Sequence, residues 1–233
     1  MDVLFRDAHL LVVNKPSGLL THRGWANDPD NALVRARVLA GTYVYPAHRL
    51  DRATSGVLVF ALSQEVASAL GGDFEAGGVR KRYLAAVRGI APDAMVIDHP
   101  LKRLTDDGHA SAAQDRQPSR TRIARLGVHE RYSLVEAEPE TGRAHQIRRH
   151  LKHISCPILG DTRYGKGEHN RACRARYGLH RLALHAAVLA LAHPITREPL
   201  VLRAPLPTDL EAPLAAMQLQ AAANAAIARE LVA

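Results

Sequence analysis

One carboxylate among arginines is the strongest chemical signal in the sequence. Residues 48–56 have the sequence HRLDRATSG, in which Asp51 lies between Arg49 and Arg52 and precedes a Thr-Ser-Gly turn and an apolar run. In an extended chain, Arg49 and Asp51 project to one face and Leu50 to the other. Neighbouring positive charge keeps a carboxylate ionised, and arginines hold phosphates. The pattern predicts a nucleophile or base that acts on a nucleotide, although a surface ion-pair cluster beside a turn has the same pattern.

A second basic segment is predicted to form a helix over residues 144–154, within the sequence TGRAHQIRRH and the residues that follow it. At about 100° per residue, one helix face is apolar and the opposite face is basic, with Arg148 at the border. The apolar face holds Ile147, Leu151 and Ile154, and the basic face holds His145, Arg149 and Lys152. A half-buried arginine can bind a carboxylate with two parallel hydrogen bonds. We therefore predict an Asp51–Arg148 pair; the alternative is a solvated basic face.

Tyr83 lies within the basic sequence RKRYLA, residues 80–85. An aromatic ring among cations can stack on a base that has left its nucleic-acid helix. Half-buried packing in a sheet is the alternative, and the residue by itself does not decide between the two.

No metal ion or nucleotide cofactor is predicted. The 13 histidines and 2 cysteines include no CxxC pair and no zincin-type arrangement of two histidines beside a carboxylate. The chain also has no GxGxxG or GxxxxGK[ST] phosphate-binding loop.

The elements that must position these residues are short strands and a few helices. Strands are predicted over residues 3–5, 10–13, 56–62, 82–89, 95–98, 121–126, 132–138, 182–191 and 200–203. Helices are predicted over residues 31–39, from Ser63 to Gly77, over 144–154, and in an Ala-rich region after Pro207. Residues 105–119 are predicted to form a mobile surface loop and residues 164–178 a strongly basic loop. The pattern favours an α+β fold around a mixed sheet.

Composition narrows the kind of partner. The 233 residues carry 31 Lys and Arg against 23 Asp and Glu, a formal charge of +8, which favours nucleic acid first and an anionic membrane surface second. With 47% hydrophobic and 23% charged residues, the chain is neither disordered nor fibrous. We expect no signal peptide or membrane anchor, and reduced cysteines (Cys156 and Cys173) in a cytoplasmic protein.

Taken together, these motifs resemble the RluA-type pseudouridine synthases, with HRLDRATSG similar to the catalytic motif of the family. The remaining similar segments follow in the family's order: VVNKPSGLLTH (residues 12–22), KRYLAAVRG (81–89), ETGRAHQIRRH (140–150), PILGDTRYG (157–165) and LHAAVLALAHPITREPL (184–200). Within the family, the short chain and the segments at residues 22–25, 170–171 and 178–182 are most similar to the C-type tRNA branch. One departure is Ala53, where Pro is common in relatives; this change is expected to loosen the turn.

The resemblance implies an α+β fold with a mixed, mostly antiparallel central sheet, flanking helices and a central cleft, and it implies no cofactor and no metal. We expect a catalytic domain over residues 1–212 and an Ala-rich helical tail over residues 213–233. The implied activity is the isomerisation of a uridine to pseudouridine in the acceptor-stem region of tRNA (the position 65 type), by a monomer without a membrane partner.

The resemblance also implies roles for individual residues. Asp51 is the catalytic aspartate, Tyr83 stacks on the target base, and Arg148 holds the aspartate in place. Arg49 enters the RNA where the target base has left. The residues expected to bind RNA are Arg49, Arg52, His48, Lys15, Arg143, His145, Arg149, Lys152, Arg171 and Arg181.

Three other functions are compatible with parts of the pattern. A synthase of the same family could act on ribosomal RNA, and a non-catalytic protein could keep the fold and only bind RNA. A nucleoside hydrolase would release free uracil and needs a second carboxylate near Asp51, which the motif lacks.

Overall fold

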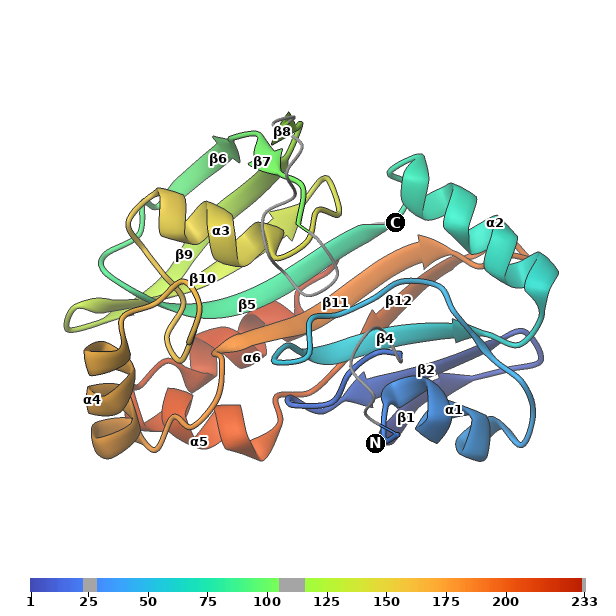
Figure 1. Cartoon of the computed structure of the whole chain (residues 1–233), viewed down its shortest axis with the longest axis horizontal. Helices are drawn as coiled ribbons and strands as arrows, with labels where there is room; N and C mark the ends of the chain where they lie inside the picture. Colours follow the sequence, from blue (N-terminus) through green and yellow to red (C-terminus); the bar gives the residue numbers. More distant parts are fainter. Residues whose placement is uncertain (23–28, 105–115, 232–233) are drawn as a thin grey trace. The chain divides into compact units, whose positions relative to one another are not determined.

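The computed structural model describes residues 1–22, 29–104 and 116–231 (Figure 1). The chain divides into two compact units. Unit 1 contains Met1–Lys81, Ala186–Pro205 and the chain end from Glu230, and unit 2 contains Arg82–His185 and Leu206–Arg229. The strand β11 therefore begins in unit 2, and the strand β5 begins in unit 1.

Unit 1 is built on strands of the large sheet. In sheet order they are β1 (Asp2–Arg6), β2 (Leu10–Lys15), β4 (Ser55–Ala61) and β11 (Leu184–Ala192), with β3 (Tyr45–Pro46) paired to β4 and β12 (Pro199–Arg203) paired to β11. The pairs β1–β2, β2–β4, β3–β4 and β11–β12 are all antiparallel. Every residue of β2 and β4 is buried, as expected of central strands with long apolar runs.

The two helices α1 (Ala32–Ala40) and α2 (Gln64–Glu75) begin at the predicted caps. The Asn31 side chain accepts a hydrogen bond from Val34 N–H, and the Ser63 side chain accepts one from Val66 N–H. Such caps satisfy backbone donors that have no partner inside the helix. The α1 helix ends at Gly41, which has the left-handed backbone typical of a helix C-terminus.

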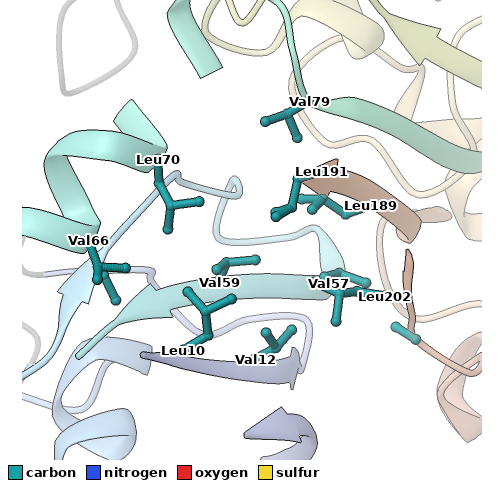
Figure 2. Packing of buried hydrophobic residues seen from close by; sticks show 12 residues of the cluster. Leu10, Val12, Val57, Val59, Val66, Leu70, Val79, Leu189, Leu191 and Leu202 are labelled. Carbon is teal, nitrogen blue, oxygen red and sulfur yellow. The ribbon is translucent and has the colours of Figure 1, made fainter. Parts of the chain in front are cut away.

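The hydrophobic core of unit 1 lies between α2 and the strands (Figure 2). Val66 and Leu70 extend from α2 towards the sheet residues, among them Val59 of β4. Alternate residues of β2 (Leu10 and Val12) supply the same cluster, because side chains two apart in a strand share one face. The core therefore fixes the position of β4, which directly follows the residues that include Asp51.

Unit 2 has its own set of antiparallel strands. In sheet order they are β5 (Arg80–Arg88), β10 (Tyr132–Pro139), β9 (Arg120–His129) and β6 (Ala94–Asp98), and a separate pair consists of β7 (Leu101–Lys102) and β8 (Arg116–Gln117). The prediction of a loop over residues 105–119 is wrong at its end, since β8 pairs with β7 there. Residues 105–115 of that predicted loop lie outside the described residues.

The helices of unit 2 are α3 (Gln146–His153), α4 (Gly167–Tyr177), α5 (Thr208–Ala216) and α6 (Gln220–Ala228). The predicted basic loop at 164–178 is wrong, because most of it is α4. Its polar composition conceals a helix with Glu168 in the first turn, Arg174 in the last turn and a left-handed Gly178 at the end. An acidic residue at the start of a helix and a basic residue at its end interact favourably with the helix dipole, and a left-handed glycine commonly ends a helix.

The C-terminal region is helical, and the predicted boundary at residue 213 falls inside α5. The α6 helix packs on β9 and β10. The buried Arg82 side chain binds this region by donating to the carbonyl oxygens of Ala226 and Arg229 over 3.1 and 2.9 Å. These contacts attach α6 to the sheet of unit 2.

Two further observations concern expectations from composition. Cys156 and Cys173 are buried and free in this structure. In the described part of the chain, no helix combines the length and the apolar character that crossing a membrane requires.

Candidate active site

Asp51 lies in a tight turn directly before β4. The Thr54 N–H donates to the Asp51 carbonyl oxygen over 3.0 Å, which closes the turn. The Asp51 side chain is partly buried, whereas Arg49 and Arg52 on either side are exposed. The predicted position of Asp51, at the entry to a buried strand and flanked by cations, is thus confirmed. We call residues 50–54 the Asp51 turn.

Lys15 anchors this turn from below the protein surface. It has no exposed surface, and its Nζ donates to the carbonyl oxygens of Pro16, Leu19 and Arg52 over 2.9, 2.7 and 3.3 Å. These acceptors satisfy the buried ammonium group, which would otherwise be costly. Lys15 cannot reach a phosphate without breaking these bonds. The contacts favour a positioning role over the RNA contact predicted from the sequence.

Two hydroxyl groups hold the same turn to residues 16–21. The Ser17 hydroxyl donates to the Ala53 carbonyl oxygen over 2.7 Å. The Thr21 hydroxyl donates to the Leu50 carbonyl oxygen over 2.9 Å and accepts from the Leu50 N–H over 3.1 Å. The turn is therefore held at both ends, including Ala53, where the sequence predicted loosening.

His48 is a neutral acceptor in this structure. Its Nε2 accepts a hydrogen bond from the Val59 N–H over 3.2 Å, and its ring stacks on Phe74 with centroids 5.0 Å apart. Burial of the ring, together with the nearby Lys81 ammonium, lowers the pKa of His48 to about 3. A neutral imidazole offers no positive charge to a phosphate. Its contacts favour positioning of the chain before Asp51 over the predicted RNA contact.

Gly56 allows β4 to pass close to β11. Its φ is +118°, and a Cβ atom there would lie 2.1 Å from the Ala186 carbonyl oxygen. Both observations require glycine at this position, two residues beyond the Asp51 turn.

In unit 2, Tyr83 belongs to β5 and is paired with Ala137 of β10. Its side chain is partly buried, between the buried neighbours Arg82 and Leu84. This placement is compatible with both alternatives from the sequence, a stacking ring and a packing ring. The role of Tyr83 in binding a base stays a prediction.

Arg148 is more deeply buried than its predicted border position indicates, with 8% of its surface exposed. It forms a two-armed ion pair with Asp161: Nε donates to Oδ2 over 2.8 Å and Nη2 donates to Oδ1 over 3.0 Å. The sequence reasoning missed Asp161. The available signal was an aspartate followed by Arg163 and Tyr164 in the segment PILGDTRYG, directly before the basic region.

The Asp161 carboxylate is itself fixed by the backbone. Its Oδ1 accepts hydrogen bonds from the N–H groups of Arg163 and Tyr164 over 2.9 and 3.0 Å. Burial alone would raise the pKa of Asp161, but the hydrogen bonds and the charge of Arg148 outweigh it and hold the pKa below its usual value. Asp161 therefore remains a carboxylate that balances the Arg148 charge.

Tyr164 and His145 complete the surroundings of Arg148. The Arg148 guanidinium lies 5.1 Å from the centroid of the Tyr164 ring, within cation–π range. The Tyr164 hydroxyl is 2.9 Å from His145 Nδ1. His145, at the start of α3, has a left-handed backbone with φ of +55°. Its predicted RNA contact would compete with this bond to Tyr164.

His150, one turn further along α3, is fully buried and structural. Its Nδ1 is 2.9 Å from the Thr121 hydroxyl, and its Nε2 is 3.0 Å from the His99 carbonyl oxygen. Burial lowers its pKa. Both ring nitrogens are thus used to hold α3 against its neighbours.

The predicted RNA-binding residues of unit 2 differ in exposure. Lys152 and Arg171 are exposed. Arg143 donates to the Pro118 carbonyl oxygen, and Arg149 to that of Lys102. Arg181 is buried and forms an ion pair with Asp209, with Nη1 2.9 Å from Oδ1; its contacts favour a structural role.

The three predicted catalytic residues belong to both units, Asp51 to unit 1 and Tyr83 and Arg148 to unit 2. Their convergence, and with it the central cleft and the Asp51–Arg148 pair, stays a prediction. Across residues 1–22, 29–104 and 116–231, no cluster of three or more His, Cys, Asp or Glu side chains is arranged to hold a metal ion.

A family model described as RNA pseudouridylate synthase matches residues 9–153. The matched region contains Asp51, Tyr83 and Arg148.

Three curated proteins named tRNA pseudouridine synthase C are similar to this chain. The Vibrio cholerae protein is 42% identical over 222 residues, covering 88% of this chain and 91% of that protein. The Pasteurella multocida protein is 44% identical over 214 residues, covering 85% and 88%. The Pectobacterium carotovorum protein is 43% identical over 220 residues, and the match covers 88% of this chain but 58% of that longer protein.

Solved structures are similar as well. Human RNA Pseudouridylate Synthase Domain Containing 4 superposes with a TM-score of 0.77 at 30% identity, covering 93% of this chain and 92% of that one. Human RNA Pseudouridylate Synthase Domain Containing 1 gives 0.72 at 28% identity, covering 88% and 83%. These likenesses confirm the α+β fold expected from the sequence.

Proposed function

Because this chain belongs to the RNA pseudouridylate synthase family, we propose that it isomerises a uridine of tRNA to pseudouridine. The observation that carries the proposal is the Asp51 turn: one partly buried carboxylate, flanked by two exposed arginines and held rigidly before a core strand. The names of the curated relatives support tRNA as the substrate.

The reaction needs only one carboxylate. The N1–C1′ bond of uridine breaks, the base turns, and a C5–C1′ bond forms; C5 loses a proton and N1 gains one, so no atom is lost overall. A hydrolytic glycosidase, in contrast, needs an acid and a base on either side of the bond. Asp51 attacks C1′ or removes a sugar proton to give a glycal-like intermediate. Both routes require an ionised carboxylate and the exclusion of water.

The other catalytic groups act on the base and on the aspartate. Tyr83 stacks on the extruded uracil and offsets part of the few kcal/mol that unstacking costs. Arg148 is the basic partner that holds the aspartate in place. Arg49 enters the RNA stack at the position that the uridine leaves.

The exposed cations supply the phosphate contacts of the tRNA. Arg49 and Arg52 flank Asp51 in unit 1, and Lys152 and Arg171 lie on α3 and α4 of unit 2. Each phosphate contact makes binding weaker at higher salt. The formal charge of +8 supports this mode of binding.

Several finer features belong to the same proposal. The target is a uridine in the acceptor-stem region, and the enzyme is a cytoplasmic monomer that uses no cofactor.

The test is the variant Asp51→Asn with mapping of pseudouridine in total RNA. We expect tRNA from a strain that lacks the gene to lose one pseudouridine, and the wild-type enzyme to restore it. Asp51→Asn should bind the same tRNA but lower the single-turnover rate by about 10³-fold or more. Asp98→Asn, an exposed aspartate of β6, is the matched control and should keep the wild-type rate.

A wild-type single-turnover rate in Asp51→Asn would show that Asp51 is not the catalytic residue. A pseudouridine missing from ribosomal RNA instead of tRNA would assign the enzyme to the other substrate class. If free uracil accumulated instead of pseudouridine, the protein would be a hydrolase.

A further inference from the structure

The guanidinium group of Arg148 contacts a carboxylate and an aromatic ring. Asp161 binds its side-on edge through Nε and Nη2, and the guanidinium carbon lies over the Tyr164 ring, 5.1 Å from its centroid. Two parallel hydrogen bonds fix the plane of a guanidinium group, which a single bond would leave free to swing. The end-on edge, formed by Nη1 and the second Nη2 hydrogen, points away from Asp161.

The pair is also balanced in charge without help from Asp51. Arg148 is 8% exposed and Asp161 is 1% exposed, so both charges are largely removed from water. A buried guanidinium without a counter-ion is strongly unfavourable, and Asp161 supplies that counter-ion. Asp161 is in turn held by two backbone N–H groups, and the Asn170 side chain of α4 donates to its backbone carbonyl oxygen over 2.9 Å.

Tyr164 is fixed from the opposite side. Its hydroxyl meets His145 Nδ1, and His145 has a backbone conformation that residues with a Cβ atom rarely adopt. Such a conformation persists where the surroundings impose it. Ring, carboxylate and helix start thus form one connected support around Arg148.

We propose that Asp161 and Tyr164 are positioning residues of the reaction: they fix the orientation of the Arg148 guanidinium group, to which the proposed function gives the role of holding the catalytic aspartate. This inference rests on the proposed function, in which Arg148 holds Asp51 in place. Neither residue touches the substrate. Their effect on the rate is transmitted through the orientation of one guanidinium group.

The first test replaces the carboxylate by an amide of the same shape. Asp161→Asn should lower the single-turnover rate by about 10²-fold, the loss typical of a reacting group misplaced by about 1 Å. The probe is the tRNA transcript in which the mapping experiment finds the modified uridine, at saturating enzyme. The Kd for this tRNA, corrected for the folded fraction, should change less than threefold.

The matched control removes an equally buried carboxylate from another arginine of unit 2. Glu136 lies 3.1 Å from Arg82, and both side chains are less than 9% exposed. Glu136→Gln should lower the melting temperature without changing the single-turnover rate of the folded protein. A loss of rate equal to that of Asp161→Asn would reduce the role of Asp161 to general stability.

Tyr164 provides an independent test if Asp161→Asn does not fold. Tyr164→Leu removes the ring but leaves the ion pair, and should lower the rate about tenfold with unchanged tRNA affinity. Tyr164→Phe keeps the ring but loses the hydroxyl contact with His145, so its rate should lie between those of Tyr164→Leu and the wild type. The inference is overturned if Tyr164→Leu and any folded Asp161→Asn keep the wild-type rate, or lose it only in proportion to weaker tRNA binding. If the wild-type enzyme makes no pseudouridine, the proposed function fails first.

Discussion

The Asp51 turn and the Arg148 region are held by different kinds of interaction. Lys15, Ser17 and Thr21 bind the backbone carbonyl and N–H groups of the Asp51 turn. Arg148, in contrast, is held directly by the charged side chain of Asp161. One region fixes the chain that carries the reactive group, and the other fixes the group itself.

The difference follows from what each side chain has to do. In the proposed function the Asp51 carboxylate acts on the sugar, and contacts to the backbone of the turn define its position without using its oxygen atoms. A long arginine side chain has many rotamers, and only contacts to the guanidinium group restrict them. The comparison therefore predicts that damage to the Asp51 turn appears mainly in stability, whereas damage around Arg148 appears mainly in rate.

The largest expected effect is a loss of stability at two glycines, one in each unit, where the backbone passes close to another segment. Gly56→Ala in unit 1 would place a Cβ atom 2.1 Å from the Ala186 carbonyl oxygen, and Gly160→Ala in unit 2 would place one 1.8 Å from that of Arg181. Each should lower the free energy of unfolding by about 4 kcal/mol or more, because backbone atoms must move. Urea denaturation of both variants measures this.

Gly71→Ala is the control for these glycines, since nothing lies within 4 Å of its Cβ position in α2. It should leave stability unchanged or raise it by up to about 1 kcal/mol. A loss below about 1 kcal/mol in Gly56→Ala would mean that β4 and β11 adjust easily, and the Asp51 turn would then not be rigidly placed.

The second prediction concerns the loss of stability when Lys15, which holds the backbone of the Asp51 turn, is replaced. Lys15→Met keeps the length of the side chain but leaves the carbonyl oxygens of Pro16 and Leu19 without this donor, whereas that of Arg52 keeps the Gly18 N–H at 2.8 Å. We expect the free energy of unfolding to fall by about 2–4 kcal/mol, since unsatisfied buried polar groups lose their solvation without compensation. Urea denaturation measures the loss, and Lys152→Met, at an exposed site, should change it by less than about 0.5 kcal/mol. Equal stability of the two variants would contradict the anchoring role of Lys15.

The smallest effect is a pH dependence that arises from His48. Its pKa is about 3 in the folded protein against 6.5 for the free side chain, so the folded state favours the neutral ring. The stabilisation is fully present above pH 6.5 and is lost as the pH falls from 6.5 towards 3, because the unfolded chain then binds a proton that the folded chain rejects.

His48→Gln removes this titrating group. Between pH 7 and pH 5.5, the wild type should lose up to about 1.4 kcal/mol more unfolding free energy than the variant, as measured in urea. Parallel curves for the two proteins would show that His48 titrates normally and that its contact with Val59 does not require the neutral ring.

The sequence predicted most of the strands, because their apolar runs contrast with polar turns. It also predicted the caps of α1 and α2, since Asn31 and Ser63 stand directly before helical spacing. It did not predict α4, because this helix is rich in cations and small residues and has no extended apolar periodicity. The buried residues of α4 are Cys173 and Tyr177. Such a helix is stabilised by the surface on which it packs, and local patterns do not show that surface.

The candidate site divides in the same manner. Asp51 and its arginines were evident because they are adjacent in the chain, and the Arg148 helix was evident from its periodicity. Asp161 was missed, because 13 residues separate it from Arg148 and a different segment supplies it. Their basic side chains predict RNA contacts for Lys15 and His48, because a sequence shows that a side chain is basic and not whether it is buried.

The order of the motifs and the residue types by themselves identified this protein as an RNA pseudouridine synthase. The residues that carry this identification are one aspartate among arginines, a tyrosine among cations and a basic helix. Only the tertiary structure decided which charged side chains are exposed to water and which are buried in hydrogen bonds and ion pairs. The reason is physical. Residue type sets the charge that a group can carry, whereas its solvation and its partners come from segments that are distant in the chain.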